Sequence, residues 1–539
     1  MQYMCEDMSL RCASSKHRER RTSNRCMAGR MLVLRRLRAA VSGRRCDSAV
    51  SSNYEQNKIR GCNPGTDGEV ENYEVLIMSD TKKKIGLFTC VATGIGAIIG
   101  SGIFGSLPAE INEIGDAVVI AFILATIYKL AASFPAVYSS SIIPASGSFF
   151  LMPTKLIHPT VGLYMAVQNL LQPVLVSVFA VLFSDYFCSI FTGLKGHETL
   201  VSVAILVIYG IMAYMGTYLF ASINSLIVVV MMVAVAVYIV LGIPNIDASQ
   251  LSIGEAFGSG IKISSIGAAV SVFASCLSGG TAVSQIADEV KNPRRDIPLA
   301  LILAPVIVAF IYILMAVVTL GCMDGDTVTT LSDVAKEFMA PGLVVFFVVG
   351  GPLCGVLTSM VPVIMLTCAQ IQAAADCGVF PKALAKKNKN GVSTGSLIYV
   401  MLFAIICVLT GSSFGILMTV FSAVNALSDI PTCIVPFFLK KKYPHACNHA
   451  GIKFKYGMII VLSVFAAVVA AFLAFSAFKA LGASVYLIIL AYMAAAVVYF
   501  IARIKYLKGK GRNLIEELKT PYDEWEAREA ECKAMDEAK

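Results

Sequence analysis

The sequence predicts an all-α polytopic membrane protein of about twelve transmembrane helices. The chain is 57% hydrophobic and only 15% charged, with a mean hydropathy of +0.74. Apolar segments recur from residue 85 to residue 502, each near the roughly 20 residues that cross a bilayer. The loops between them are alternately rich and poor in Lys and Arg, which is typical of membrane proteins with a fixed orientation.

This composition excludes several other classes of protein. A soluble protein keeps roughly 25% charged residues, so the apolar excess indicates burial in lipid rather than a string of soluble domains. The net charge of +9 does not predict nucleic-acid binding, because most bases lie between apolar segments. The 16 cysteines show no paired spacing, and many lie inside apolar segments, so they do not predict a disulfide framework.

The hydropathy pattern places the helices, and the loops between them test the count. The expected spans are 85–107, 116–142, 159–186, 199–217, 221–242, 264–287, 298–321, 341–372, 393–411, 413–438, 456–478 and 482–502. One alternating set of loops carries most of the bases, and the opposite set carries only Lys195, Lys262, Lys336 and Lys479. The positive-inside rule therefore predicts that both termini face the cytosol. The sequence does not specify which membrane.

Three regions are expected. Residues 81–503 form the transmembrane domain, and residues 504–539 form a cytosolic tail in which 513–537 can be helical. Residues 1–80 are rich in Arg and Ser and then polar, which predicts a disordered cytosolic region. Because Met78 resembles a translation start, two explanations of this region remain open: an over-extended gene model, or a basic arm that touches anionic lipid.

The first predicted helix contains a cluster of small residues. Gly94, Gly96, Gly100, Ser101 and Gly102 all lie in the segment 85–107. Glycine destabilises a helix interior by about 0.8–1.0 kcal/mol relative to alanine. The cluster therefore favours either close helix packing or a break whose free backbone N–H groups can hold a carboxylate.

The sixth predicted helix carries a matching cluster of Ser278, Gly279, Gly280 and Thr281. Helices one and six each open a block of five helices. Interruptions at corresponding positions are the sequence pattern of a transporter built from inverted repeats, with the substrate between the breaks. The match therefore favours two broken helices over simple packing.

Four motifs between residues 84 and 439 resemble those of the amino acid–polyamine–organocation superfamily of transporters. They are GSGIF at 100–104, PASGS at 144–148, DEVKNPRRDIP at 288–298 and DCGVFP at 376–381. The resemblance implies a LeuT-type fold, in which two inverted repeats of five helices are followed by two further helices. It also implies an amino acid permease or antiporter that needs no cofactor.

The resemblance further implies a substrate site at the two breaks. The substrate carboxylate would meet Ser101 and Gly102, next to Gly100, which is a further candidate site residue. Its ammonium group would meet backbone carbonyls near Ile98 and in helix six, where the candidate residues are Ser275, Ser278, Gly279, Gly280 and Thr281. A zwitterion needs N–H donors at one end and carbonyl acceptors at the other, which two broken helices supply. No catalytic residue is expected.

The chain departs from the family at positions that carry charge or aromatic rings in relatives. Thr281 stands where many relatives have an acid, and YSSS at 138–141 stands where many have a Glu. The only Trp is Trp525 in the tail, which leaves Phe273 or Phe347 as candidates to stack on a cation. No Lys lies in helix five. Proton coupling and the charge of the substrate therefore remain open.

Two ionisable residues lie within predicted helices, Lys129 in helix two and Asp429 in helix ten. Each costs about 2.5–3.5 kcal/mol near a helix centre, which predicts a role in coupling or gating. Asp429 could carry a proton or pair with a cationic substrate. The structural alternatives are a capped Pro-kinked helix and a Lys that extends to the membrane surface. We expect no direct pair, because the predicted depths differ by roughly a helical turn or more.

Two loops contain further candidate residues. Asp288 and Glu289 follow helix six and are expected to gate the site by pairing with cytoplasmic bases, although the prolines of this loop also explain it as a simple turn. His445, Cys447 and His449 alternate in a predicted cytosolic loop. Without a fourth ligand nearby they do not predict a metal site.

Two functions remain open. The first is a secondary transporter that works by alternating access and is driven by a gradient or by exchange, because the sequence contains no phosphate-binding loop. The second is a sensor or signalling membrane protein that does not transport. No His, Cys and Asp constellation supports an enzyme. The expected partners are an amino acid and the bilayer, not nucleic acid, with a single-pass subunit attached through Cys188 or Cys322 as a further possibility.

Overall fold

The computed structural model describes most of the chain after residue 85. The described residues are 86–100, 102–143, 148–216, 218–247, 262–279, 290–323, 327–452 and 454–537. They belong to the second of two units into which the chain divides, Met1–Lys82 and Lys83–Lys539. The expectations for residues 1–80 and for a start at Met78 therefore lie outside the described residues.

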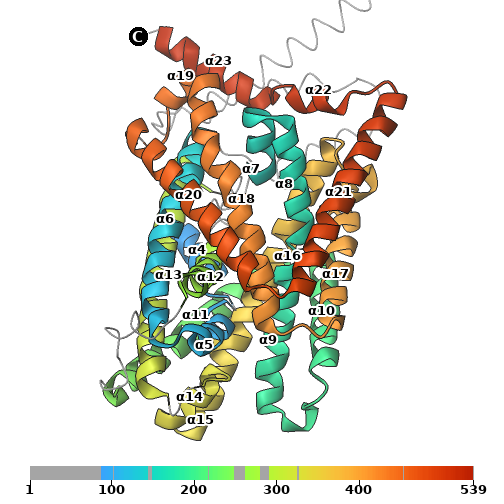
Figure 1. Ribbon diagram of the computed structural model, residues 1–539. Helices are drawn as coiled ribbons and strands as arrows, with labels where there is room; N and C mark the ends of the chain where they lie inside the picture. Colours follow the sequence, from blue (N-terminus) through green and yellow to red (C-terminus); the bar gives the residue numbers. More distant parts are fainter. Residues whose placement is uncertain are drawn as a thin grey trace, which may run out of the picture. The chain divides into compact units, whose positions relative to one another are not determined.

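Helices build the described part of the chain, in which Lys387 and Ser393 form an isolated bridge. The helices in Figure 1 are α4 (Leu87–Ile99), α5 (Gly102–Ile114), α6 (Val118–Ile142), α7 (Ser148–Met152), α8 (Pro159–Leu171), α9 (Val174–Ile190), α10 (Glu198–Met215), α11 (Tyr218–Gly242), α12 (Ile263–Cys276), α13 (Pro293–Cys322), α14 (Leu331–Phe338), α15 (Pro341–Val348), α16 (Cys354–Asp376), α17 (Thr394–Leu409), α18 (Phe414–Lys442), α19 (Pro444–Asn448), α20 (Tyr456–Ala480), α21 (Ala483–Gly509), α22 (Leu514–Lys519) and α23 (Asp523–Glu537).

The helices confirm the predicted all-α polytopic fold. Among the described residues, nine helical stretches are long and apolar enough to cross a membrane, and one of them, Gly102–Ile142, contains both α5 and α6. Shorter apolar helices lie at the remaining predicted spans: α4, α12 and α17. A chain in lipid must pair its backbone N–H and C=O groups internally, which explains why these apolar segments are helical.

Two of the predicted spans, which form the helical stretches Pro159–Ile190 and Pro341–Asp376, contain a local irregularity. The predicted helix 159–186 divides into α8 and α9 at Pro173, whose ring cannot continue the hydrogen-bond ladder. The predicted helix 341–372 divides into α15 and α16 around a π-helical turn, Val349–Leu353, which contains Gly350, Gly351 and Pro352. Hydropathy alone does not reveal these interruptions, because both sides of each are apolar.

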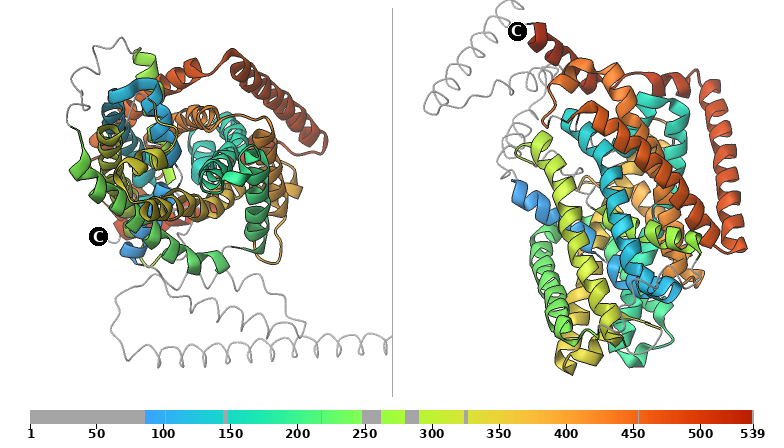
Figure 2. Two further views of the ribbon diagram at one scale, coloured as in Figure 1. Left: turned by 90° about the horizontal axis from the view of Figure 1, so that it is seen from below. Right: turned by 60° about the vertical axis from the view of Figure 1, so that its left-hand side comes forward.

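Most of the transmembrane helices form two groups, which meet through α18 and through a direct contact of α4 with α16. The first group packs α4 and α6 against α13, and α5 and α6 against α12. The second group packs α9, α10, α16 and α17 against one another, with α8 against α16. α18 contacts α6 and α12 of the first group and α8 and α9 of the second (Figures 1 and 2). α18 therefore lies at the boundary between the two groups.

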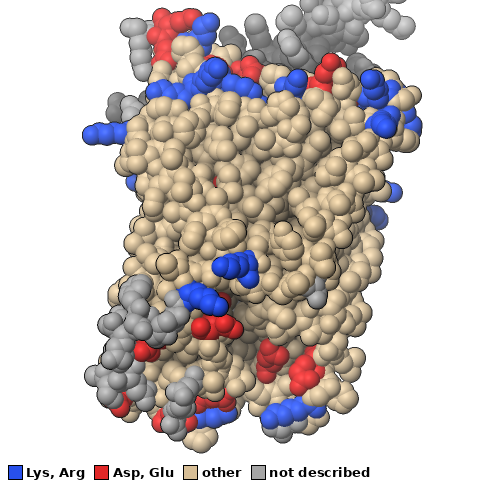
Figure 3. All heavy atoms as spheres, in the orientation of Figure 1, with Lys and Arg blue, Asp and Glu red and all other residues tan. Residues whose placement is uncertain are grey.

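The last transmembrane helix, α21, lies at the periphery and is mostly exposed (Figure 2). Its exposed side chains include Leu487, Ile488, Leu490 and Val498. The face in Figure 3 likewise shows a broad belt with few charged residues below the end that carries α19, α22 and α23. Such apolar exposure is unfavourable in water, which agrees with contact to lipid chains.

The C-terminal tail forms two helices rather than the single helix expected at 513–537. The chain bends between α22 and α23 at Pro521, which cannot donate a backbone hydrogen bond. Trp525 at the start of α23 is 1% exposed, and its ring lies against Tyr443 (6.3 Å between centroids) and Tyr522 (5.6 Å). The tail is therefore docked through a buried aromatic contact.

A carboxylate clamp holds the far end of α23 to α19. The Nδ1 atom of His445 and the Nε2 atom of His449 lie 2.9 and 2.7 Å from the two carboxylate oxygens of Asp536. Glu529 accepts hydrogen bonds from the backbone N–H groups of His445 and Ala446, at the N-terminus of α19. The two histidines that alternate with Cys447 thus contact a carboxylate. Within the described ranges no group of three or more metal-ligating side chains occurs.

The clamp should make tail docking sensitive to acid. The histidines lower the pKa of the Asp536 carboxyl to about 2 from its ordinary 3.8. A lowered pKa means that the contribution to docking is fully present above the ordinary value and is lost as the pH falls through about 2. We expect the emission of Trp525, the chain's only Trp, to shift to longer wavelength over that window.

Replacing Asp536 with Ala should produce the same fluorescence shift at neutral pH, together with easier quenching of Trp525 by acrylamide. Asp523→Ala is the matched control, because it removes a carboxylate from the other end of α23. Unchanged emission and quenching in Asp536→Ala would contradict a docking role for the clamp.

Candidate functional site

The first transmembrane helix is broken where the sequence predicts. α4 ends at Ile99 and α5 begins at Gly102, and Gly100 between them has φ −25° and ψ −130°, outside the helical region. In helix six, α12 ends at Cys276 and one further turn leads to Gly279, after which residues 280–289 lie outside the description. The described parts of both breaks contain small residues, Gly100 in helix one and Ser278 and Gly279 in helix six.

Glycines at the breaks allow backbones to approach closely. A Cβ added at Gly279 would lie 2.7 Å from the carbonyl carbon of Ala97 and 3.0 Å from Ile98 Cα. One at Gly100 would lie 2.7 Å from Ser359 Cβ, and one at Gly102 would lie 3.0 Å from Cys276 Sγ. The broken helices thus touch each other and α16 with no room for a side chain. The two explanations of the glycine clusters, close helix packing and a helix break, therefore both apply at these positions.

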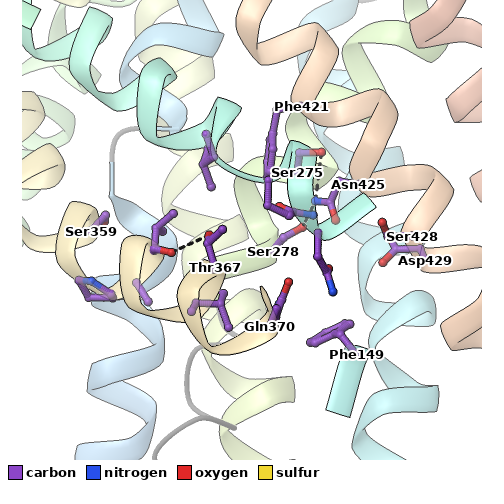
Figure 4. A pocket seen from close by; sticks show the side chains of 18 of the residues that line it. Phe149, Ser275, Ser278, Ser359, Thr367, Gln370, Phe421, Asn425, Ser428 and Asp429 are labelled. Carbon is purple, nitrogen blue, oxygen red and sulfur yellow. Dashed lines mark hydrogen bonds between the residues drawn. The ribbon is translucent and has the colours of Figure 1, made fainter. Parts of the chain in front are cut away.

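A cavity lies beside the contact between the two breaks (Figure 4). Its wall includes Ala97 of α4, Gly279 after α12, and side chains of α7, α8, α16 and α18, so both helix groups contribute. Its volume of about 100 Å³ for the centres of water molecules leaves room for several waters or one small solute.

A hydrogen-bonded bridge joins α18 to the helix-six break at the cavity wall. The Asn425 amide donates to Ser278 Oγ at 3.0 Å and to Ser275 Oγ at 3.4 Å (Figure 4). Ser278 also donates to the carbonyl of Ala274. The bridge fixes two of the predicted site residues, Ser275 and Ser278, against α18.

Three other lining side chains carry buried polar atoms without a protein partner. They are Asn169 Nδ2 on α8, and Ser359 Oγ and Gln370 Oε1 on α16. A buried polar atom left unpaired costs about 1–3 kcal/mol, so such atoms normally meet water or a ligand. The cavity therefore offers both donor and acceptor capacity to a polar solute.

A buried ion pair borders the cavity. Lys129 Nζ on α6 lies 3.1 Å from Asp429 Oδ2 on α18, with the two side chains only 10% and 13% exposed. The Tyr128 hydroxyl donates to the same oxygen at 2.9 Å. The expectation that Lys129 and Asp429 do not pair is wrong, because α6 packs against α18 and the flexible four-carbon stem of Lys spans the difference in depth.

Apart from Lys129, the predicted site residues fall into three sets. Ser275, Ser278, Gly279 and Asp429 line the cavity. Ile98, Gly100 and Gly102 are buried beside it, and the Ile98 carbonyl accepts a hydrogen bond from the Tyr312 hydroxyl at 3.0 Å. Ser101, Gly280, Thr281, Asp288 and Glu289 lie outside the described residues.

Several cavity residues were missed, although the sequence carried a signal for them. Asn169, Ser359, Gln370 and Asn425 are polar residues inside apolar segments, and polar residues in membrane helices commonly face the interior of the bundle. The amino-acid composition of the transmembrane segments did not show which face of each helix lies toward the cavity.

The aromatic candidates and the outer cysteines are engaged elsewhere. Phe273 stacks on Phe122 at 4.2 Å between centroids, and Phe347 packs on Phe104 and Tyr238, so neither ring lines the cavity. The thiols of Cys188 and Cys322 are buried and contact the carbonyls of Leu194 and Gly242. As packed, neither thiol is presented for linkage to a second subunit.

Comparison with known proteins identifies the family to which the chain belongs. The family model described as amino acid permease matches residues 85–498. The chain belongs to this family. Its broken first helix and its polar cavity are therefore features of an amino acid permease, a class of membrane transporter rather than an enzyme.

The relatives of this permease transport chemically different solutes, by their names. The chain is 27% identical to the methylthioribose transporter of Bacillus subtilis (strain 168), over 57% of the chain and 70% of that protein. It is 26% identical to the branched-chain amino acid permease BcaP of the same organism, over 44% and 55%. It is 28% identical to cationic amino acid transporter 1 of Arabidopsis thaliana, over 44% and 42%. The chain thus spans about half the length of the latter two relatives.

We expect Gly279→Ala to destabilise the permease, because the new methyl group would meet the backbone of α4, which cannot rotate away. Overpacking of this kind costs about 1–3 kcal/mol, so the thermal midpoint of the solubilised protein should fall. Gly457→Ala in α20 is the matched control, since a Cβ there meets nothing within 4 Å. Equal midpoints for the two variants would contradict a close contact between the breaks.

Proposed function

We propose that the chain is a secondary amino acid transporter that binds its substrate in the cavity beside the two breaks. One observation carries the proposal: buried polar atoms of Asn169, Ser359 and Gln370 without protein partners surround a cavity next to broken helices. Backbone groups freed at such breaks suit the carboxylate and ammonium groups of a zwitterion. Relatives named as a branched-chain amino acid permease and as a serine/threonine exchanger support this substrate class.

The arrangement of the helices supports an alternating-access mechanism. The cavity is bordered by α4 and α12 from the first group and by α8 and α16 from the second. Movement of one group against the other would expose the cavity to each side of the membrane in turn. Ser101, Gly280 and Thr281 remain proposed substrate contacts, and Asp288 and Glu289 remain proposed gating residues.

Orientation follows from the distribution of bases. The last turn of α18 carries Lys440, Lys441 and Lys442, and the last turn of α21 carries Lys508. Both ends lie beside the tail helices α22 and α23 (Figure 1), so we propose that this end faces the cytosol. One relative is named as a serine/threonine exchanger, which makes exchange a proposed mode of coupling.

Transport should be tested with purified protein in proteoliposomes. Uptake and counterflow of the twenty amino acids, ornithine, polyamines and methylthioribose would be measured across pH, with and without sodium. Counterflow of at least one amino acid is expected. Saturable amino acid binding without flux would instead indicate a sensor, and flux of methylthioribose alone would exclude the proposed substrate class.

Gln370→Ala should weaken substrate binding by about tenfold, because it removes a buried acceptor worth about 1–3 kcal/mol to a polar ligand. Gln372→Ala is the matched control: it lies on the same helix, and its amide donates to Asp376 at 3.3 Å instead of facing the cavity. Affinity would be measured by calorimetry in detergent. Equal affinities for both variants would place the substrate elsewhere.

A further inference from the structure

We infer that the site selects amino acids whose side chain is polar but uncharged, and that the Lys129–Asp429 pair sets this selectivity by neutralising the carboxylate on the cavity wall. The inference rests on the proposed function and names the substrate class of the same site. It concerns Lys129, which lies behind the wall and would act on the substrate only through Asp429.

The described lining residues contain one carboxylate and no base. Asp429 is the carboxylate, and the remaining polar lining side chains are Asn, Gln, Ser or Thr. Lys129 contributes one positive charge at 3.1 Å from Asp429 Oδ2. The described wall and its ion pair therefore carry no net charge, and the Tyr128 hydroxyl further satisfies the same oxygen.

The pair lies within reach of a substrate side chain. Asn425 is hydrogen-bonded to Ser278 at the helix-six break. Asp429 lies four residues after Asn425 on the same helix, α18. Four residues along a helix are one turn, about 6 Å. A substrate whose backbone groups occupy the break can therefore extend its side chain toward Asp429.

A charged substrate side chain would be unfavourable at this position. A cationic group could pair with Asp429 only by displacing Lys129, which would leave the Lys ammonium buried and unpaired. An anionic group would lie beside the Asp429 carboxylate, and the Lys129 ammonium is already paired with that carboxylate. Burial of an unpaired charge is far more costly than burial of a hydrogen-bonded polar group.

A neutral polar side chain would find complementary partners. Asn169 Nδ2 is a donor and Gln370 Oε1 is an acceptor, and both are buried without a protein partner. Amide and hydroxyl groups both donate and accept, so they can satisfy these atoms, whereas an aliphatic side chain would leave them unpaired. Serine, threonine, asparagine and glutamine are the amino acids with this chemistry.

The test is competition binding with these four amino acids and with arginine, lysine and ornithine, on purified full-length protein. The wild type should bind the best neutral polar amino acid at least tenfold more tightly than any cationic one. Lys129→Met should reverse this preference by freeing Asp429, and adding Asp429→Asn to that variant should abolish the gain. Lys336→Met is the matched control, because it breaks the exposed Lys336–Asp333 pair and should leave the preference unchanged.

Each outcome is decisive. A wild type that binds cationic or aliphatic amino acids best would overturn the inference while leaving amino acid transport intact, whereas absence of any amino acid binding would overturn the proposed function itself. A folded Lys129→Met variant without a gain for cationic amino acids would also overturn the role of the pair. If Lys129→Met does not fold, Lys129→Gln takes its place: it likewise removes the counter-charge of Asp429 and should gain affinity for cationic amino acids, and a folded Lys129→Gln variant without that gain would overturn the inference.

Discussion

A helix can be broken inside a membrane only where its freed backbone groups meet protein or a polar cavity. Tyrosines perform this task around the break between α4 and α5. Tyr312 donates to the carbonyl of Ile98 before the break. Tyr186 donates to the carbonyl of Phe104 in α5, which lacks its helical donor because Pro108 has no backbone N–H. The Tyr186 hydroxyl also accepts from the N–H of Leu331. The break is thereby fixed to α13, α9 and α14, which belong to different parts of the bundle.

The same constraint explains why small residues surround the break. A Cβ at Gly355 of α16 would lie 2.5 Å from the carbonyl oxygen of Gly100, and Gly279 lies against Ala97 and Ile98. Backbone meets backbone at these points, so a side chain cannot be added without moving a helix. The cavity lies beside this tight contact, and its lining includes buried polar atoms that the packed helices do not pair.

The sequence predicted the helices and the breaks because both depend on local composition. Long apolar segments must be helical in lipid, and clustered glycines weaken a helix wherever it packs. The ion pair between Lys129 and Asp429 depends instead on how α6 crosses α18, and counting residues from the ends of straight helices gave the wrong answer. Asn169 and Gln370 were visible as polar residues in apolar segments, but the rotation of α8 and α16 that turns them toward the cavity is a tertiary property.

The π-helical turn at Val349–Leu353 sets that rotation for α16. A π turn accommodates one residue more than the α-helical ladder would, and each residue of an α-helix advances the azimuth by about 100°. If this stretch were wound as a regular α-helix, everything after it would be rotated by about 100° and shifted by about 1.5 Å relative to α15. Ser359 would then leave the break, and Gln370 would leave the cavity wall. Because of this one additional residue, α15 and α16 can both pack against α11 while α16 also presents residues to the cavity.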